Sequence, residues 1–217
     1  MLYEQTLIIA PHPDDEVLGC GGYMAKAQRS GFQVHLAVAT TNNSEVRLRE
    51  LDECAKHFNL ASTTMFYPNA SFWLDSIPNA DLVRYVERCI ETIRPVCIML
   101  PHPDSFHQEH RAVSQATFSA LRPSGGTGKW RPSVVALYEA PFDSWTLTGS
   151  QFRPTMYVAL NQHDIDKKVQ GMAIHASQDR PAPSERSSDA IYGLAGLRGA
   201  QCGEQWAEAY ELRLLKI

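Results

Sequence analysis

The stretch Thr6-Leu7-Ile8-Ile9-Ala10-Pro11-His12-Pro13-Asp14-Asp15-Glu16 decides both the expected fold and the expected site. A short apolar run bounded by Pro and Asp is typical of a buried strand in a parallel sheet. Ligands of such sheets bind at the carboxyl ends of strands, and here an imidazole and a cluster of carboxylates follow the strand directly. Clustered carboxylates repel one another unless a cation lies among them, which favours a metal site with a spare carboxylate. The alternative is an ordinary helix start, because Asp, Glu and Pro all favour the first turn of a helix.

The rest of the chain alternates strand-like apolar runs with helix-like patterns, as in a sheet covered by helices on both faces. We therefore expect an α/β fold, a three-layer sandwich with a mostly parallel central sheet. The expected strands cover 6–10, 33–40, 64–67, 96–100 and 133–139, with 153–160 as a later edge strand. The expected helices cover 17–30, 44–58, 80–93, 109–121, 165–177 and 204–212. Two further stretches, 124–128 and 180–189, are expected to be surface loops.

The composition limits the classes of function. With 217 residues, of which 44% are hydrophobic and 20% charged, residues 1–217 are expected to form a single domain. The net charge of −4 comes from mixed signs without a basic stripe, which argues against nucleic acid and favours a small-molecule partner. No stretch approaches ~18 consecutive apolar residues, so we expect no integral membrane segment and a cytoplasmic protein. The five scattered cysteines are typical of reduced thiols.

A second group of polar side chains follows the expected strand at 96–100, in the segment His102-Pro103-Asp104-Ser105-Phe106-His107-Gln108-Glu109-His110. The carboxyl ends of parallel strands meet at one edge of a sheet, so the two groups are expected to converge on one pocket. There His12 and Asp15 present N and O atoms, and His110 supplies a third ligand from the next helix. Such a set leaves a fourth position open for water, which distinguishes catalytic from structural zinc, and its imidazoles argue against magnesium.

The glycines after the first motif do not indicate a dinucleotide site. Gly19, Gly21 and Gly22 do not spell G-x-G-x-x-G, and the acidic pair Asp14 and Asp15 would face a pyrophosphate with like charge. We therefore reject a nicotinamide or flavin cofactor, and we expect the glycines to let the first helix pack close to the sheet.

Taken together, the segment 10–16, its glycine cluster and the later pattern His107-x-x-His110 resemble the PIG-L/LmbE family of zinc-dependent de-N-acetylases. Weaker likenesses extend over most of the chain. The segment 47–51 resembles the family's Arg-x-x-Glu-Leu helix, 168–178 its Lys…His-x-Ser-Gln segment, and 206–210 its closing Tyr-Ala-Glu-Ala-Phe. The resemblance implies a Rossmann-like three-layer sandwich and hydrolysis of an N-acetyl group from an N-acetylglucosamine-type amino sugar conjugate.

The resemblance also implies roles for individual residues. The residues that match the family's Zn2+ ligands are His12, Asp15 and His110. Other divalent metals also fit this set. Asp14 matches the general base that takes a proton from water. His107 matches the histidine that stabilises the oxyanion, and a neighbouring carboxylate is expected to keep it protonated near neutral pH.

Several further candidates fit an ordinary structural role as well. Arg47 matches an arginine that the family places near the sugar, or it lies on a helix surface. His102 lines the pocket, or it is a plain strand-end histidine. This chain departs from the family's His-Pro-Asp-His, so either Asp104 or Glu109 is expected to support His107. Alternatively, both carboxylates are solvated charges. Trp73 and Phe72 stack on a sugar ring or, as we favour, pack in the core.

We therefore expect an enzyme, a metal-dependent amidohydrolase that acts on the linear amide of a small-molecule amino sugar conjugate. The alternatives are another metal-dependent hydrolase, such as a phosphoesterase, and a catalytically silent sugar-binding domain. A phosphoesterase usually needs two metal ions, for which the ligands are too few, and a binding domain needs no spare base. The sequence does not indicate which aglycone the substrate carries. It also does not decide whether the protein forms a homo-oligomer, as some family members do.

Overall fold

The computed structural model describes residues 4–67, 73–123, 128–144 and 152–217. Its strands are β1 (Gln5–Ala10), β2 (Gln33–Thr40), β3 (Ser62–Tyr67), β4 (Cys97–Pro101), β5 (Val134–Tyr138), β6 (Met156–Leu160) and β7 (Trp206–Leu215). Its α-helices are α1 (Asp15–Arg29), α2 (Glu45–His57), α3 (Asn79–Ile93), α4 (Gln108–Ala120), α5 (Gln162–Ile174) and α6 (Ser188–Cys202), and its 3-10 helices are η1 (Leu74–Ser76) and η2 (Pro141–Ser144). Of the loop expected at 124–128, only Gly128 lies within the described residues.

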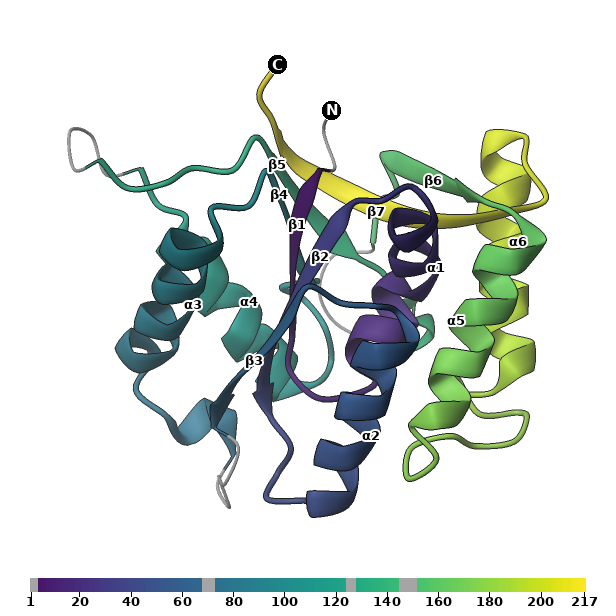
Figure 1. The fold of residues 1–217 in the computed structure, drawn as a ribbon, viewed down its shortest axis with the longest axis horizontal. Helices are drawn as coiled ribbons and strands as arrows, with labels where there is room; N and C mark the ends of the chain where they lie inside the picture. Colours follow the sequence, from purple (N-terminus) through teal and green to yellow (C-terminus); the bar gives the residue numbers. More distant parts are fainter. Residues whose placement is uncertain (1–3, 68–72, 124–127, 145–151) are drawn as a thin grey trace.

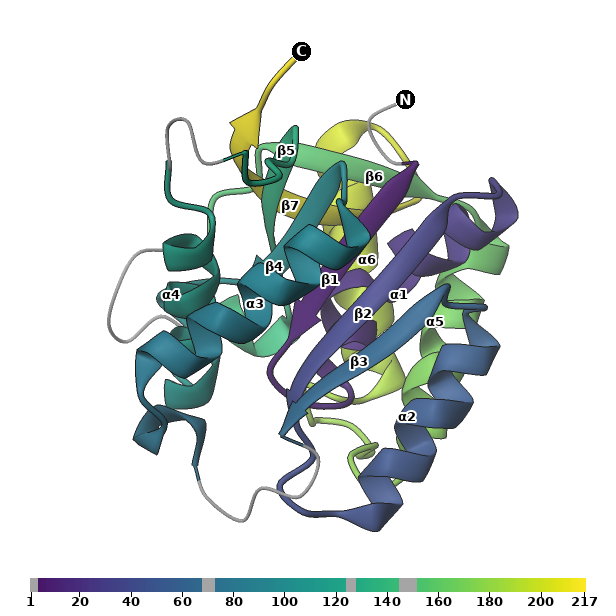
Figure 2. The ribbon, with the colours of Figure 1, turned by 60° about the vertical axis from the view of Figure 1, so that its left-hand side comes forward.

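All seven strands form one sheet in the order β3-β2-β1-β4-β5-β7-β6. The first five strands in this order run parallel, and β7 runs antiparallel to both of its neighbours. Helices α3 and α4 cover one face, while α1, α2, α5 and α6 lie on the other side (Figures 1 and 2). The expected three-layer α/β sandwich is confirmed, and β6 is the expected edge strand. From β1 the sheet extends through β2 in one direction and through β4 in the other, which makes this the topological switch point.

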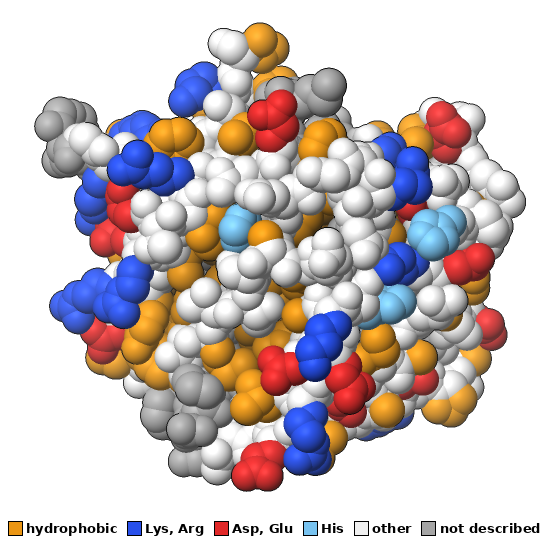
Figure 3. Space-filling model, in the orientation of Figure 1, with side chains coloured by type: hydrophobic (Ala, Val, Ile, Leu, Met, Phe, Trp, Pro, Cys, Tyr) orange, Lys and Arg blue, Asp and Glu red, His pale blue; other side chains and the backbone are white. Residues whose placement is uncertain are grey.

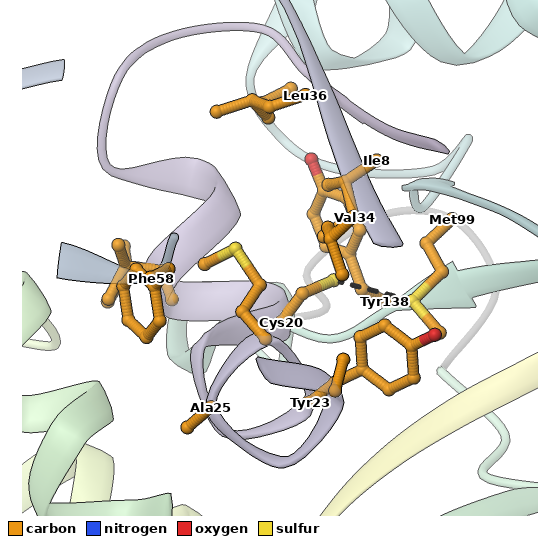
Figure 4. Close-up of a cluster of buried hydrophobic side chains, with 14 of the residues drawn as sticks. Ile8, Cys20, Tyr23, Ala25, Val34, Leu36, Phe58, Met99 and Tyr138 are labelled. Atoms are coloured by element: carbon orange, nitrogen blue, oxygen red, sulfur yellow. Dashed lines mark hydrogen bonds between the residues drawn. The ribbon is translucent and has the colours of Figure 1, made fainter. Parts of the chain in front are cut away.

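Two hydrophobic cores account for the continuous apolar run of β1. Successive side chains of a strand point to opposite faces of the sheet. Ile8 and Ala10 pack in the core beneath α1, which Figure 4 shows around Tyr138, while Leu7 and Ile9 pack in the core beneath α3 and α4. All four residues of the run are fully buried. A strand covered by helices on both faces needs apolar side chains at every position, so no alternation is visible in its sequence.

The glycines of α1 let this helix lie close to the sheet, as expected. A Cβ atom placed on Gly19 would overlap the ring of Tyr138, and one placed on Gly22 would overlap the side chain of Leu160. Each of these partners belongs to a strand, β5 or β6. The small residues therefore set the distance between the sheet and the helix that carries the acidic motif at its N-terminus.

A buried ion pair contacts the backbone of α1. Here Lys168 Nζ donates to the carbonyl oxygen of Leu18 at 2.8 Å, and Glu208 Oε1 accepts from Gly22 N at 2.7 Å. Lys168 and Glu208 lie 2.7 Å apart, and Glu208 Oε2 also accepts from Tyr23 N at 2.7 Å. Residues of α5 and β7 thus hold the first helix through its main chain.

The helix expected at 204–212 is wrong, because residues 206–212 belong to strand β7. Five consecutive residues of β7, from Ala207 to Glu211, are buried between β5 and β6. Two of them are glutamates, which make the segment resemble a polar helix. Glu208 is buried because its carboxylate is satisfied by Lys168 and by backbone amides, a compensation that local sequence does not reveal.

Helix α6 is unexpected, since the sequence pattern predicts a loop at 180–189 and nothing regular directly after it. Its N-cap is Ser187, whose side chain accepts from Ala190 N at 3.2 Å, and Gly203 ends it with a φ of 82°. Glycines inside the helix lower its helix propensity, so the sequence pattern does not indicate a helix here. Gly199 is needed for packing, because a Cβ atom there would meet the backbone oxygens of Glu204 and Gln205.

The surface agrees with the mixed charge of the sequence. On the face that Figure 3 shows, Lys and Arg side chains are interspersed with Asp and Glu. The five cysteines are free, and only Cys202 is exposed. Within the described ranges, no helix is both long enough and apolar enough to cross a membrane.

Candidate active site

The two polar segments lie side by side, because β1 and β4 are parallel neighbours in the sheet. Helix α1 begins at Asp15, directly after the motif's first aspartate, and α4 begins at Gln108 with His107 as its N-cap. Each segment thus turns from the carboxyl end of a strand into the N-terminus of a helix. Both turns occur at the same edge of the sheet, at the switch point where α/β folds bind ligands.

The three residues expected to bind a metal converge on one point. His12 Nδ1 lies 3.3 Å and His110 Nε2 lies 3.2 Å from the same atom, Asp15 Oδ2. Potential ligand atoms of the three residues all lie within 4.8 Å of one another. The three side chains are buried. Two imidazole nitrogens and a carboxylate in this arrangement form a donor set that fits a divalent cation of the zinc type.

Glu109 supports His12 rather than His107. Its Oε2 lies 2.8 Å from His12 Nε2, and its Oε1 accepts from the backbone N of Leu74 at 2.7 Å. Of the two carboxylates expected near His107, Glu109 is therefore paired with a different histidine. A carboxylate on the outer nitrogen of a ligating histidine fixes the ring orientation and raises its basicity.

Asp14 lies beside the cluster with both carboxylate oxygens engaged by arginines. Arg47 Nη2 lies 3.3 Å from Oδ1, and Arg186 Nε lies 3.0 Å from Oδ2. Burial and the negative charge of Asp15 raise the pKa of Asp14 to about 6, although the two arginines lower it. Its backbone has a φ of 108°, which is uncommon for a residue with a side chain. Asp14 is therefore a buried, firmly held carboxyl group outside the set of three converging residues.

His107 is held by α4 at the mouth of the cluster. Its Nδ1 accepts from the backbone N of Glu109 at 3.3 Å, so the neutral ring carries its proton on Nε2. The ring centroids of His12 and His110 lie 5.4 Å and 4.9 Å away. Burial and the two neighbouring histidines lower the pKa of His107. The carboxylate of Glu109 is turned toward His12, so it is not the partner that was expected to keep His107 protonated near neutral pH.

The three converging residues interact strongly as an ionic group. Burial lowers the pKa of His12, but hydrogen bonds and charges from Asp15 and Glu109 raise it overall to about 9. Burial raises the pKa of Asp15, yet His110 and His12 bring it well below its usual range. A divalent cation at this point would compete with the proton that the raised pKa places on His12. Cation binding must then release a proton, since histidine binds metals in its neutral form.

A pocket of about 410 Å³ opens over this cluster, a volume in the usual range for small-molecule sites. The residues that line it are His12, Asp14, Asp15, Asn42, Arg47, Trp73, Phe106, His107, Glu109, His110, Phe142, Gln178, Glu185 and Arg186. Arg47 therefore belongs to the pocket and not to an open helix surface. Trp73 is 59% exposed, so the favoured core packing is wrong; its neighbour Phe72 lies outside the described residues.

Two of the expected residues lie away from this pocket. His102 is buried, accepts from Asp104 N at 3.2 Å through Nδ1, and has its Nε2 3.5 Å from Glu211 on β7. Neither His102 nor Asp104 lines the pocket. A strand-end histidine describes the position of His102 better than a substrate contact does.

Sequence reasoning misses the contribution of the segment after α5. Gln178, Glu185 and Arg186 line the pocket, and Arg186 contacts Asp14 directly. The sequence predicts a loop here, which either rims the site or simply connects two elements. No motif within it indicates which of its side chains reach Asp14. The weak likeness at 168–178 is the only signal that this part of the chain lies near the site.

Comparison with protein families decides the classification. The profile of the PIG-L family, described as GlcNAc-PI de-N-acetylase, matches residues 7–121, more than half of the chain. The chain belongs to the PIG-L family. An uncharacterized deacetylase of Escherichia coli, YaiS, is 27% identical over 187 residues, which cover 79% of this chain and 90% of the relative. The resemblance drawn from the two histidine segments is thereby confirmed, and the chain is a PIG-L family deacetylase.

Solved structures confirm the fold of this PIG-L protein. The N,N'-diacetylchitobiose deacetylase of Pyrococcus horikoshii superposes with a TM-score of 0.77 and 18% identity, covering 97% of this chain and 84% of that protein. GalB, the 4-carboxy-2-hydroxymuconate hydratase of Pseudomonas putida, has a TM-score of 0.73 and 15% identity, covering 98% of each chain. The Rossmann-like sandwich therefore carries more than one chemistry, and the substrate has to be argued from the site.

Proposed function

We propose that this PIG-L family deacetylase is a zinc-dependent hydrolase that removes the N-acetyl group from an N-acetylglucosamine-type amino sugar conjugate, and that residues 1–217 act as a single domain. The observation that carries the proposal is the convergence of His12, Asp15 and His110 within 4.8 Å beside a fourth residue, Asp14, that is not part of this set. Three ligands with an open fourth position suit catalytic zinc. A spare carboxylate beside them suits a general base.

The donor set fits zinc in its chemistry as well as in its number of ligands. His12 and His110 each direct one nitrogen at Asp15 Oδ2, and Glu109 holds the outer nitrogen of His12. Zinc, when bound, makes water a better nucleophile and polarises the acetyl carbonyl as a Lewis acid. Magnesium would prefer a site made of oxygen ligands.

The side chains around this set then have separate tasks. Asp14 takes the proton of the attacking water and returns it to the nitrogen of the departing amine. His107 donates a hydrogen bond from Nε2–H to the former carbonyl oxygen, on which negative charge grows in the transition state. Arg47 and Arg186 keep Asp14 ionised and fix the direction of its carboxylate.

The walls of the pocket support a sugar as the group that carries the amide. Trp73, Phe106 and Phe142 offer apolar ring surfaces, while Gln178 and other polar side chains offer hydrogen-bonding groups. A pyranose ring presents an apolar face together with hydroxyls around its edge. The combination of aromatic and polar lining therefore suits it, as is usual for small-molecule sites.

The proposal is tested by zinc analysis together with an acetate-release assay on a panel of N-acetylglucosamine conjugates. We expect equimolar zinc, acetate release that a chelator stops, and recovery when zinc is added back. N-acetyl amino acids and a phosphate monoester serve as control substrates. Acetate release that survives complete metal removal, or release of phosphate without acetate, would contradict the proposal. Sugar binding without any turnover would favour the silent binding domain instead.

A further inference from the structure

A series of buried contacts connects the end of α5 to the backbone of Asp14. His175 follows α5, and its Nε2 lies 2.8 Å from Glu16 Oε1. The other carboxylate oxygen of Glu16, Oε2, accepts a hydrogen bond from the backbone N of Asp14 at 3.0 Å. Glu16 and His175 are both 0% exposed, and neither lines the pocket. They reach the proposed base only through its main chain.

The main chain of Asp14 needs such support. With a φ of 108° and a ψ of −32°, Asp14 lies in a region that side-chain-bearing residues rarely adopt. Strained conformations of this kind persist only where their surroundings hold them. The carbonyl of Asp14 accepts from Val17 N at 3.1 Å and from Leu18 N at 2.9 Å, while its amide is held by Glu16. The peptide groups on both sides of its Cα are fixed, and so is the direction of its side chain.

Neither a second metal site nor fold stability accounts well for the buried pair of Glu16 and His175. Together with Cys54 these residues have the composition of a metal site, but direct hydrogen bonds already join them, with Cys54 Sγ 3.6 Å from Glu16 Oε1. Well-packed apolar residues usually stabilise a core at least as well as a buried ion pair does, so stability alone does not call for these two side chains. The contact that apolar residues could not supply here is the acceptor for the amide of Asp14.

We propose that Glu16 and His175 are positioning residues that hold Asp14 in its catalytic conformation. The inference rests on the proposed function in so far as Asp14 is the general base. His175 orients the carboxylate of Glu16, and Glu16 holds the amide of Asp14. Without the donor from His175, Glu16 is free to rotate, Asp14 relaxes toward an ordinary backbone conformation, and its carboxylate turns away from the attacking water. Zinc binding is spared, because neither residue belongs to the ligand set.

The test compares two variants of one residue. His175→Leu removes the donor, and we expect kcat to fall about 10²-fold, as for a catalytic group displaced by about 1 Å, with KM and zinc content unchanged. His175→Gln keeps a side-chain N–H directed at Glu16 and is expected to recover most of kcat. Glu16→Gln, which has only one acceptor oxygen for two donors, is expected to resemble His175→Leu.

A matched control separates positioning from general destabilisation. Arg198 and Glu139 form another buried pair, with Arg198 Nε 2.7 Å from Glu139 Oε2, and neither residue lines the pocket. Arg198→Met is expected to lower the melting temperature while leaving kcat unchanged well below it. If His175→Leu behaves in the same way, or loses activity only in proportion to lost zinc, the positioning role is overturned.

A crystal structure of His175→Gln beside one of His175→Leu gives a readout that does not depend on turnover. We expect Asp14 to keep its positive φ and its contacts with Arg47 and Arg186 in the Gln variant and to lose them in the Leu variant. If Asp14 is unchanged in both, the inference fails, whether or not acetate is released. If His175→Leu does not fold, Glu16→Gln takes its place in the same comparison. An inactive wild-type enzyme would contradict the proposed function, and the conformation of Asp14 would still decide the inference.

Discussion

Two buried clusters of histidine and carboxylate side chains flank Asp14. The histidines of the outer cluster line the pocket, and the histidine of the inner cluster does not. In the outer cluster, His12 Nδ1 and His110 Nε2 both point at one oxygen of Asp15, and the group opens into the pocket. In the inner cluster, His175 Nε2 is already bound to Glu16 at 2.8 Å, away from the pocket. Residue composition alone does not separate a metal site from a structural pair. Access from the pocket distinguishes the outer cluster, and on this ground we propose it as the metal site.

The largest loss of zinc and of turnover is expected for a substitution of a proposed metal ligand in the outer cluster. His110→Ala removes one of three donors, so we expect loss of zinc and with it all turnover. Elemental analysis of the purified variant measures this directly. His102→Ala is the matched control, because His102 is a buried histidine outside the pocket and its loss should leave zinc in place. Full zinc occupancy in His110→Ala would remove this residue from the ligand set.

Asp14→Asn tests the proposed general base separately from metal binding. The amide keeps the size of the side chain but cannot accept a proton, so we expect zinc to stay bound while kcat falls by about 10²- to 10⁴-fold. Zinc content and acetate release are measured on the same preparation. Activity within about tenfold of the wild type would place the base elsewhere.

His107→Ala is expected to lower kcat by about 10²- to 10³-fold with zinc retained, since the lost hydrogen bond acts in the transition state. His107 is also the N-cap of α4, so the Ala variant should be less stable by about 1 kcal/mol. His107→Asn restores a capping oxygen but not the longer reach of imidazole. We expect His107→Asn to recover the melting temperature without recovering kcat. If both recover, His107 only caps α4 and does not stabilise the transition state.

Glu109→Gln is expected to weaken zinc binding by about 10- to 100-fold, because the outer nitrogen of His12 loses its carboxylate partner. Competition with a chelator of known affinity measures the change. Asp104→Asn is the control, since Asp104 is exposed and does not line the pocket. Equal zinc affinities in the two variants would show that the contact between Glu109 and His12 does not support the metal.

The smallest effect, no change in zinc content, is expected for Cys54 beside the inner cluster. Cys54→Ala removes a thiol that contacts Glu16 at 3.6 Å, and we expect zinc content to stay equimolar with the chain. Elemental analysis after loading with excess zinc checks this. A second equivalent of zinc in the wild type that disappears in Cys54→Ala would mean that both clusters bind metal, and the distinction between them would fail.

The sequence predicts the parts of the molecule whose signals are local. The run from Leu7 to Ala10, followed by His12 and the aspartates, indicates a buried strand that ends in a site, and the structure has β1 there. The pattern His107-x-x-His110 likewise follows β4. Because parallel strands deliver their ends to one edge of the sheet, the convergence of the two motifs follows from topology alone.

What the sequence misses depends on distant partners. Glu208 looks like a helix surface residue until Lys168 and the backbone of α1 are placed around it, so the pattern predicts a helix where β7 lies. Arg186 contacts Asp14 from a segment without a motif. Glu109 turns toward His12, although the family pattern suggests a partner of His107. Each of these contacts joins residues far apart in the chain, and local patterns carry no information about them.

The ion pair of Lys168 and Glu208, which contacts the backbone of α1, has a consequence for how the molecule is made. Glu208, which accepts from two amides of α1, follows Gly22 by 186 residues in the sequence and is synthesised well after it. Domains form as units during synthesis, so α1 gains these acceptors only after β7 has been translated. A nascent chain carries the residues of the proposed metal site long before β7 is made, so we expect the proposed hydrolysis only once β7 holds α1 in place.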